Sequence, residues 1–129
     1  MPNLFLLFNH QLTAAQRAAA GSDLGVRQII HPPPEVRSIW SNIPPEETSI
    51  FSFLAPVRSW LEAEAGPGDF VLIQGDFGAC YLMVNFAFEK GLVPVYSTTS
   101  RVAREERQAD GGVRLVHTFN HVRYRKYVR

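Results

Sequence analysis

The chain has 129 residues, the length of one small domain, and its 46% hydrophobic and 19% charged residues can bury a core, which excludes an intrinsically disordered chain. Its single cysteine, Cys80, excludes an internal disulfide framework and a cysteine-rich zinc site. Because no apolar run approaches the roughly 18 to 20 residues of a membrane span and no basic region precedes the first apolar run, we expect a cytosolic protein.

The formal net charge of +1 conceals an uneven distribution of charge. Residues 1–89 carry four basic and nine acidic side chains, a net charge of −5, whereas residues 90–129 carry nine basic and three acidic side chains, a net charge of +6. A basic C-terminal third favours an anionic partner such as a nucleotide or a nucleic acid, although a basic tail can also serve only to keep a domain soluble.

The first 30 residues predict a strand, a helix and a second strand. Residues 4–8 (LFLLF) form an apolar run without polar alternation, which is typical of a strand buried on both faces of a parallel sheet. Thr13 is a plausible N-cap for the alanine-rich helix that follows, and Gly21 lies near the end of that helix. Residues 26–30 predict the second, shorter strand.

Two further helices are predicted before residue 66. The first is short, ends at Pro44 and Pro45, and carries the apolar residues Val36, Ile39 and Trp40. In the second, apolar residues recur at helical spacing from Ile50 to Leu61, and Pro56 inside that pattern predicts a break or a kink.

The second half of the chain predicts the remaining strands. Residues 70–73 predict a third buried strand, and residues 92–96 predict a fourth with a polar exit. Between them we expect a helix that buries Phe77, Cys80, Val84, Ala87 and Phe88. A charged stretch that fits a helix or a strand then leads to a turn at 110–112 and to an alternating strand at 113–119.

Strands separated by helices indicate βαβ units. We therefore predict the α/β class and a single Rossmann-like domain over residues 1–129, with a mostly parallel sheet flanked by helices and antiparallel C-terminal edge strands.

Polar residues follow each predicted strand, at the edge where open α/β sheets bind ligands. They are Asn9, His10 and Gln11 after the first strand, His31 after the second, Gly75 and Asp76 after the third, and Thr98, Thr99, Ser100 and Arg101 after the fourth.

The chemistry of these side chains leaves alternatives open. Histidine titrates near neutral pH, so His10 can serve as a general acid or base, or it can be structural. Asp76 suits a helix N-cap, and it would bind ribose hydroxyls rather than phosphate. The hydroxyls of residues 98–100 and the Arg101 guanidinium suit phosphate oxygens, or they cap a helix.

Other patterns are weaker. His121, Arg123 and Tyr124 mix basic and aromatic side chains, which suits base stacking or a charged edge strand. His117 and His121 lie four residues apart, but on a strand this spacing does not form a metal site, so we expect no metal. Because neither a P-loop nor a GxGxxG motif occurs, we expect no cofactor.

Five segments together resemble one small family: LFNHQLT near the start, IPPE at 43–46, GDFGA at 75–79, GLVPVYSTTSR at 91–101 and HTFNHVRYRKY at 117–127. This family is the CRISPR-associated Csx type numbered twenty, one of the small ring nucleases of type III CRISPR systems. The resemblance spans nearly the whole chain. It implies a fold similar to the CRISPR-associated Rossmann fold and cleavage of cyclic oligoadenylate, chiefly cyclic tetra-adenylate, to switch antiviral defence off.

The resemblance also implies a homodimer and a metal-independent reaction, in which a ribose 2′-hydroxyl attacks the adjacent phosphate. We predict that His10 and Arg101 are catalytic. The predicted ligand contacts are Asn9, Gln11, Gly75, Asp76, Phe77, Gly78, Thr98, Thr99, Ser100, His121 and Arg123.

Two other functions fit the same residues. A non-catalytic module that senses or sequesters the cyclic nucleotide would use identical contacts. An accessory subunit would use the basic C-terminal third to bind RNA or another protein, whereas a ring nuclease requires neither long nucleic acid nor a membrane.

Overall fold

The apolar runs of the sequence form the centre of a parallel sheet in the computed structural model, which describes residues 1–129 apart from the side chains of Val102 and His117. β1 (Leu4–Leu7) is buried along its whole length and pairs in parallel with β2 (Ile29–Ile30) on one side and β3 (Phe70–Ile73) on the other. β3 also pairs in parallel with β4 (Val93–Arg107), and β5 (Val113–Lys126) pairs antiparallel with β4 at the edge.

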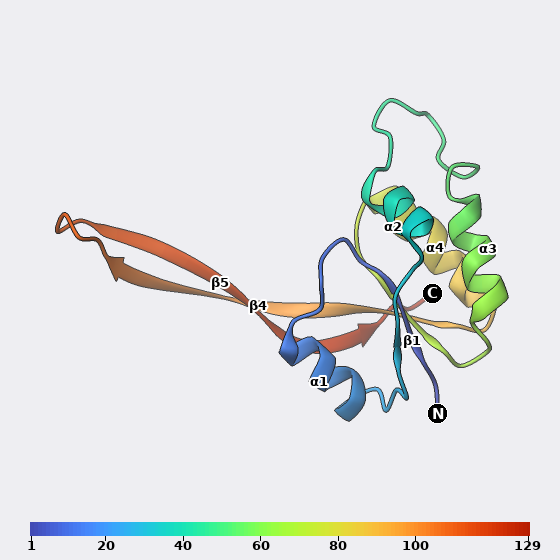
Figure 1. The fold of residues 1–129 in the computed structure, drawn as a ribbon, viewed down its shortest axis with the longest axis horizontal. Helices are drawn as coiled ribbons and strands as arrows, with labels where there is room; N and C mark the ends of the chain where they lie inside the picture. Colours follow the sequence, from blue (N-terminus) through green and yellow to red (C-terminus); the bar gives the residue numbers. More distant parts are fainter.

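The described strands therefore form a five-stranded sheet in the order β2-β1-β3-β4-β5. Helices cover both faces of this sheet (Figure 1). The first face carries α1 (Ala14–Ser22), and the second face carries α2 (Pro34–Ser41), α3 (Ala55–Glu64) and α4 (Phe77–Glu89). The prediction of an α/β, mostly parallel Rossmann-like sheet with an antiparallel C-terminal edge is confirmed.

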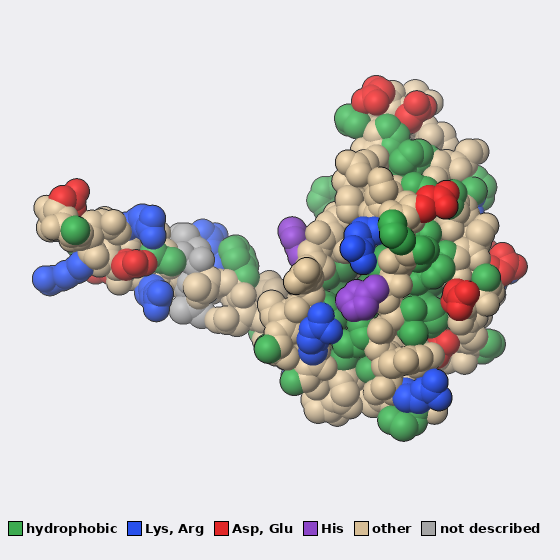
Figure 2. Space-filling model, in the orientation of Figure 1, with side chains coloured by type: hydrophobic (Ala, Val, Ile, Leu, Met, Phe, Trp, Pro, Cys, Tyr) green, Lys and Arg blue, Asp and Glu red, His purple; other side chains and the backbone are tan. Residues whose placement is uncertain are grey.

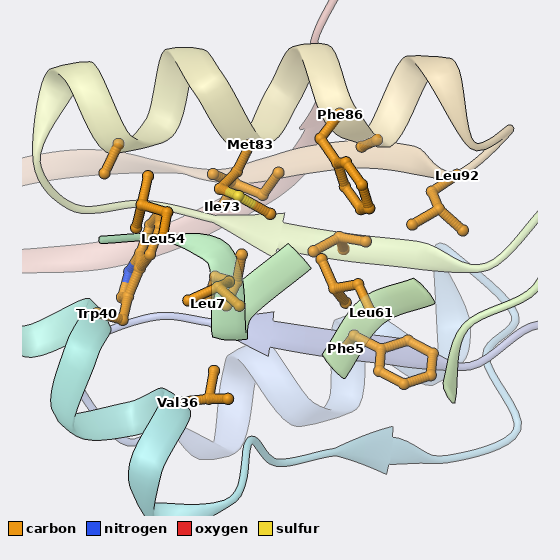
Figure 3. Close-up of a cluster of buried hydrophobic side chains, with 14 residues drawn as sticks. Phe5, Leu7, Val36, Trp40, Leu54, Leu61, Ile73, Met83, Phe86 and Leu92 are labelled. Carbon is orange, nitrogen blue, oxygen red and sulfur yellow. The ribbon is translucent and has the colours of Figure 1, made fainter. Parts of the chain in front are cut away.

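Two apolar clusters hold the layers together. On the second face, Phe5 and Leu7 of β1 pack with residues of α2, α3 and α4 (Figure 3). On the first face, Leu4 and Leu6 pack with Leu12 and with Ala20 of α1. Because β1 contributes to both clusters, its uninterrupted apolar run is explained.

Local signals of the sequence begin the first two helices. The Thr13 hydroxyl accepts a hydrogen bond from the Gln16 amide at 3.1 Å, and the Gln16 side chain accepts one from the Thr13 amide at 2.9 Å. This reciprocal capping box begins α1. Pro34 begins α2, where its missing amide proton costs nothing.

Four expectations about elements need correction. The second strand is limited to residues 29–30. Pro56 lies in the first turn of α3, where it begins the helix rather than kinking it. The helix after the third strand buries Ala79, Met83, Phe86 and Ala87. Of the face expected to be buried, Ala87 lies in the core, and Cys80 and Val84 are half-buried against it. Phe77 in particular is 95% exposed, because the apolar face of α4 extends beyond the part that contacts the sheet.

The largest correction concerns the fourth strand. It continues to Arg107, and together with β5 it projects from the body as a long two-stranded arm (Figure 1). Residues 97–101 are therefore part of a paired strand and not a loop after one. The register shifts by one residue between Thr98 and Thr99, which marks a β-bulge near the base of the arm.

None of the helices among the described residues combines the length and hydrophobicity needed to cross a bilayer.

Candidate functional site

The strand order reverses direction between β1 and β3, which is the switch point where sheets of order 2-1-3-4-5 bind ligands. Directly beyond it lies a small cavity lined by residues following β1, among them Asn9 and His10, and by residues following β3, Gln74 and Gly75. The structure thus brings two of the predicted groups together at the predicted edge.

A second cavity, of about 350 Å³, lies next to this one on the side of β2. It shares Asn9 and His10 with the first cavity. We call the two cavities together the strand-end pocket. The polar side chains lining the second cavity are Asn9, His10, Gln11, Arg17, His31, Arg37 and Ser41.

Basic groups dominate the strand-end pocket. Arg17 from α1 and Arg37 from α2 approach it from opposite faces of the sheet, and His10 and His31 line the same cavity. No carboxylate is among the described residues that line the two cavities. Figure 2 shows histidine and basic side chains close together on the body near the base of the arm. The pocket is therefore suited to an anionic ligand.

Hydrogen bonds fix the orientation of two pocket side chains. The Ser41 hydroxyl donates to Oδ1 of Asn9 at 3.2 Å, which leaves the Asn9 amide group as the donor for a ligand. Gln74 accepts two hydrogen bonds, from Trp40 Nε1 to its carbonyl at 2.9 Å and from the Ser97 amide to its side chain at 2.8 Å. The turn after β3 is thus held by α2 and by β4.

Gly75 and Asp76 have clear local roles. A Cβ at position 75 would lie 3.0 Å from Trp40 Nε1, so a larger residue would have to displace the buried indole ring by a few tenths of an ångström. The Asp76 carboxylate accepts from the Ala79 amide at 3.0 Å and so caps α4, as the sequence predicts. Gly78 follows in the first turn of that helix, where Asp76 Oδ2 would lie 3.5 Å from a Cβ.

An aromatic groove of about 670 Å³ lies on the outer face of α4. It begins at Gln74 and Gly75, so it adjoins the strand-end pocket, and it continues past Phe77 towards the chain terminus at Arg129. Its remaining aromatic lining consists of Tyr81, Phe88, Tyr96 and Tyr127. Burial raises the pKa of the Tyr127 phenol to about 12, and its hydroxyl donates to the Ile73 carbonyl at 2.7 Å.

Cys80 also lines this groove, and its thiol is a poor nucleophile. Its pKa is raised to about 11, chiefly by burial and to a smaller extent by the nearby Asp76 charge, against a hydrogen bond with the Gly75 backbone that lowers it. A thiol of this kind is protonated at neutral pH, which favours the structural interpretation of Cys80.

At the base of the arm, buried polar groups connect α1 with β4 and β5. Gln16 Nε2 donates to the Ser97 hydroxyl at 3.3 Å, and Ser97 Oγ lies 2.5 Å from His121 Nδ1. The Tyr124 hydroxyl donates to the Gln16 carbonyl at 2.9 Å. The Ser97 hydroxyl therefore joins the Gln16 side chain to the His121 ring.

The environment of the His121 ring favours its neutral form. Burial lowers its pKa, and the charge of Asp23 opposes that effect only in part. Its Nε2 is buried and has no hydrogen-bond partner among the described residues. Burial likewise raises the pKa of Tyr124 to about 12.

The other predicted contacts lie along the arm, outside the cavities described above. The Thr98 hydroxyl donates to the Arg123 carbonyl at 3.0 Å and accepts from the Arg123 amide at 3.2 Å. These two hydrogen bonds occupy the hydroxyl in the pairing of the strands at the β-bulge. Thr99 and Ser100 are exposed, and the Arg101 guanidinium lies 5.9 Å from the Phe119 ring centroid.

Sequence reasoning missed Arg17, Arg37 and Gln74. The two arginines sit inside helices, where an exposed basic residue carries no local signal, and Gln74 precedes the turn that was singled out. No group of three or more His, Cys, Asp or Glu side chains among the described residues could hold a metal ion. The His117 side chain lies outside the described residues.

The fold and the strand-end pocket define a Rossmann-like α/β protein with a basic cavity at the switch point. Over residues 2–125 the chain matches, and belongs to, the family described as "Uncharacterized protein MJ1673 family". It is similar to "Uncharacterized protein MJ1673" of Methanocaldococcus jannaschii, with 49% identity over 127 residues that cover 98% of each chain. No solved structure matches the chain. The resemblance to the ring nucleases stays a prediction.

Proposed function

We propose that this protein is a ring nuclease that binds cyclic oligoadenylate, most simply cyclic tetra-adenylate, and cleaves it without a metal to switch off type III CRISPR signalling. The observation that carries the proposal is the strand-end pocket, in which His10 lies with Arg17 and Arg37 and no described carboxylate. The arginines suit phosphates, and His10 suits proton transfer.

The proposed reaction needs no nucleophile from the protein. A ribose 2′-hydroxyl attacks its adjacent phosphorus, the bond from phosphorus to the 5′-oxygen breaks, and the products are a 2′,3′-cyclic phosphate and a 5′-hydroxyl. His10 accepts the proton of the attacking hydroxyl, and the proton that the 5′-oxygen takes up comes from solvent. Arg17 and Arg37 hold the phosphate and stabilise the charge that develops on it.

The aromatic groove supports the adenine part of the ligand. A base placed beyond Gly75 can stack on Phe77, whose ring is 95% exposed, or on Tyr81. Base stacking on an aromatic ring contributes about 1–3 kcal/mol per base. A stacked base would thus cover the Phe77 ring, whose exposure to water is unfavourable.

The arm supplies the other proposed contacts. We assign Thr99, Ser100 and Arg123 to ligand binding, whereas Arg101 lies outside the strand-end pocket, so the charge on the reacting phosphate is left to Arg17 and Arg37. A homodimer would double these groups around a ring that can have two-fold symmetry.

The test is incubation of the purified chain with cyclic tetra-adenylate in EDTA, with the products separated by chromatography. We expect cleavage to linear products that end in a 2′,3′-cyclic phosphate, because the described residues contain no group of three or more His, Cys, Asp or Glu side chains that could hold a metal ion. Loss of cleavage in EDTA that manganese restores would contradict the metal-independent reaction.

The same experiment distinguishes the two other functions. Tight binding without product would assign the chain as a sensor or a sequestering module. Binding of long RNA with steep salt dependence, and no preference for the cyclic ligand, would assign it as an accessory subunit.

A further inference from the structure

The arm exposes more apolar surface than an isolated hairpin can maintain in water. From Thr99 to Arg107 it extends about 27 Å at the usual rise per strand residue, and it projects away from the helices (Figure 1). A two-stranded hairpin without a covering layer is at best marginally stable. Yet Val113, Leu115 and Phe119 are exposed by 59%, 58% and 67%.

These three residues lie on one face of the arm. Side chains of a strand alternate between faces, so positions 113, 115 and 119 of β5 share a face, which we call the apolar stripe. The register adds the opposite residues of β4, since Arg107 pairs with Val113, Glu105 with Leu115 and Arg101 with Phe119.

The other face of the arm is arranged differently. There, Glu106 and Arg114 pair across the strands and lie 3.8 Å apart, so opposite charges meet within the hairpin. On the stripe, Glu105 instead stands opposite Leu115, so its direct cross-strand neighbour is apolar.

The total surface of the chain also indicates a missing partner. Its accessible area is 8123 Å², whereas a compact monomer of its mass, 14.5 kDa, exposes about 6,900 Å². The excess is larger than the roughly 800 Å² that each partner buries in a standard interface.

We infer that a second copy of this chain covers the apolar stripe, with the two arms packed face to face and antiparallel around a two-fold axis that crosses β4 at Ala103. This axis brings Phe119 over Leu115 of the second copy and Arg101 over Glu105 of the second copy. Each contact then occurs twice, as an isologous interface requires. The stripe thus places apolar residues over apolar residues and opposite charges over each other.

The same axis has a consequence for the ligand contacts proposed on the arm. It brings Arg107, near the arm's tip, over Thr99 of the second copy, at the base of that copy's arm. The proposed ligand contacts of each copy would then include a basic side chain from the other copy. This consequence rests on the proposed function, whereas the interface itself does not.

Sedimentation of the full chain tests the interface. We expect the wild type to be a dimer. Phe119→Lys should raise the dimer Kd about 100-fold, because the two-fold axis removes two contacts that contribute about tenfold each. Val116→Lys, a control on the opposite face, should remain a dimer. A monomeric wild type, a folded Phe119→Lys dimer, or equal dissociation of both variants would overturn the inference.

Charge reversal and crosslinking decide the question even if Phe119→Lys fails to fold. Arg101→Glu and Glu105→Arg should each weaken the dimer, and the double variant should restore it. In a Cys80→Ala background, a short bis-maleimide should crosslink Ala103→Cys but not Arg104→Cys on the opposite face. Absence of rescue, or equal crosslinking at both positions, would overturn the inference.

Cleavage assays separate the two proposals. Arg107→Ala should slow cleavage of cyclic tetra-adenylate while the chain still sediments as a dimer. Wild-type cleavage by Arg107→Ala would remove that residue from the site and leave the interface standing. Absence of cleavage by the wild-type chain would refute the proposed function and leave the sedimentation result unaffected.

Discussion

Replacing Arg17 and Arg37 by alanine tests the strand-end pocket most directly. Both side chains line the cavity of about 350 Å³ beside His10, and both are exposed to solvent. A hydrogen bond to a charged group contributes about 1.5–3 kcal/mol, and exposure favours the lower end. Each substitution should therefore raise the Kd for cyclic tetra-adenylate about tenfold, and the double variant about 100-fold if the two arginines act independently.

The assay is calorimetric titration with a cyclic tetra-adenylate whose 2′-hydroxyls are methylated, so that cleavage does not interfere. Salt dependence gives a second readout, because removing two phosphate contacts should reduce the slope of log Kd against log salt by about 1.4 for a single-stranded ligand. Arg58→Ala is the matched control, since the Arg58 guanidinium donates to the Phe51 carbonyl at 2.7 Å, outside the cavities of the site. A double variant that binds within threefold of the wild type would refute the phosphate-binding role of the pocket.

Three further predictions concern single side chains. His10→Ala should slow single-turnover cleavage about 100-fold or more if proton transfer is its role, with an unchanged Kd; an unchanged rate would make His10 structural. Because burial lowers the pKa of His121, the stability contributed by the neutral ring is complete above the unfolded pKa of about 6.5 and is lost as the pH falls from there through the lowered pKa of the folded state. The loss of melting temperature between pH 7.5 and 5.0 should then be smaller for His121→Gln than for the wild type, and an equal loss would contradict this. Phe5→Ala should reduce the free energy of unfolding in urea by about 3–5 kcal/mol, because Phe5 is 1% exposed. Phe77→Ala is the control, and because Phe77 is 95% exposed it should change the free energy of unfolding by less than about 0.5 kcal/mol. Similar losses for the two variants would mean that Phe5 is not part of the core.

The elements that the sequence predicted well are those with a local cause. β1 was evident because burial on both faces removes polar alternation from its four residues. α1 was evident because the Thr13 cap precedes a run of strong helix formers. The groups at the strand-end edge followed from the connection rules of parallel sheets, which do not require knowledge of side-chain packing.

The elements that the sequence missed depend on what lies outside them. Hydrophobic patterns report which residues are covered by the same chain, and the arm beyond Ser97 is mostly uncovered. Its polar composition therefore favoured a loop or a helix as much as a strand. The prediction that Phe77 is buried was wrong, because an apolar residue at the start of a helix was assigned to the core although its side chain faces solvent. Arg17 and Arg37 became recognisable as neighbours only through the packing of α1 and α2 on opposite faces.

The network at the base of the arm links these uncovered parts to the site. α1 begins at Thr13, three residues after His10, and Gln16 attaches that helix to Ser97 of β4 while its carbonyl accepts from Tyr124 of β5. The loop that carries His10 is therefore anchored to the two strands that form the arm. A second copy that fixes the arm would also restrain this loop, because a buried polar network resists displacement of any one member. Dimerisation through the arm and the positioning of His10 would then be coupled through Gln16, Ser97 and Tyr124.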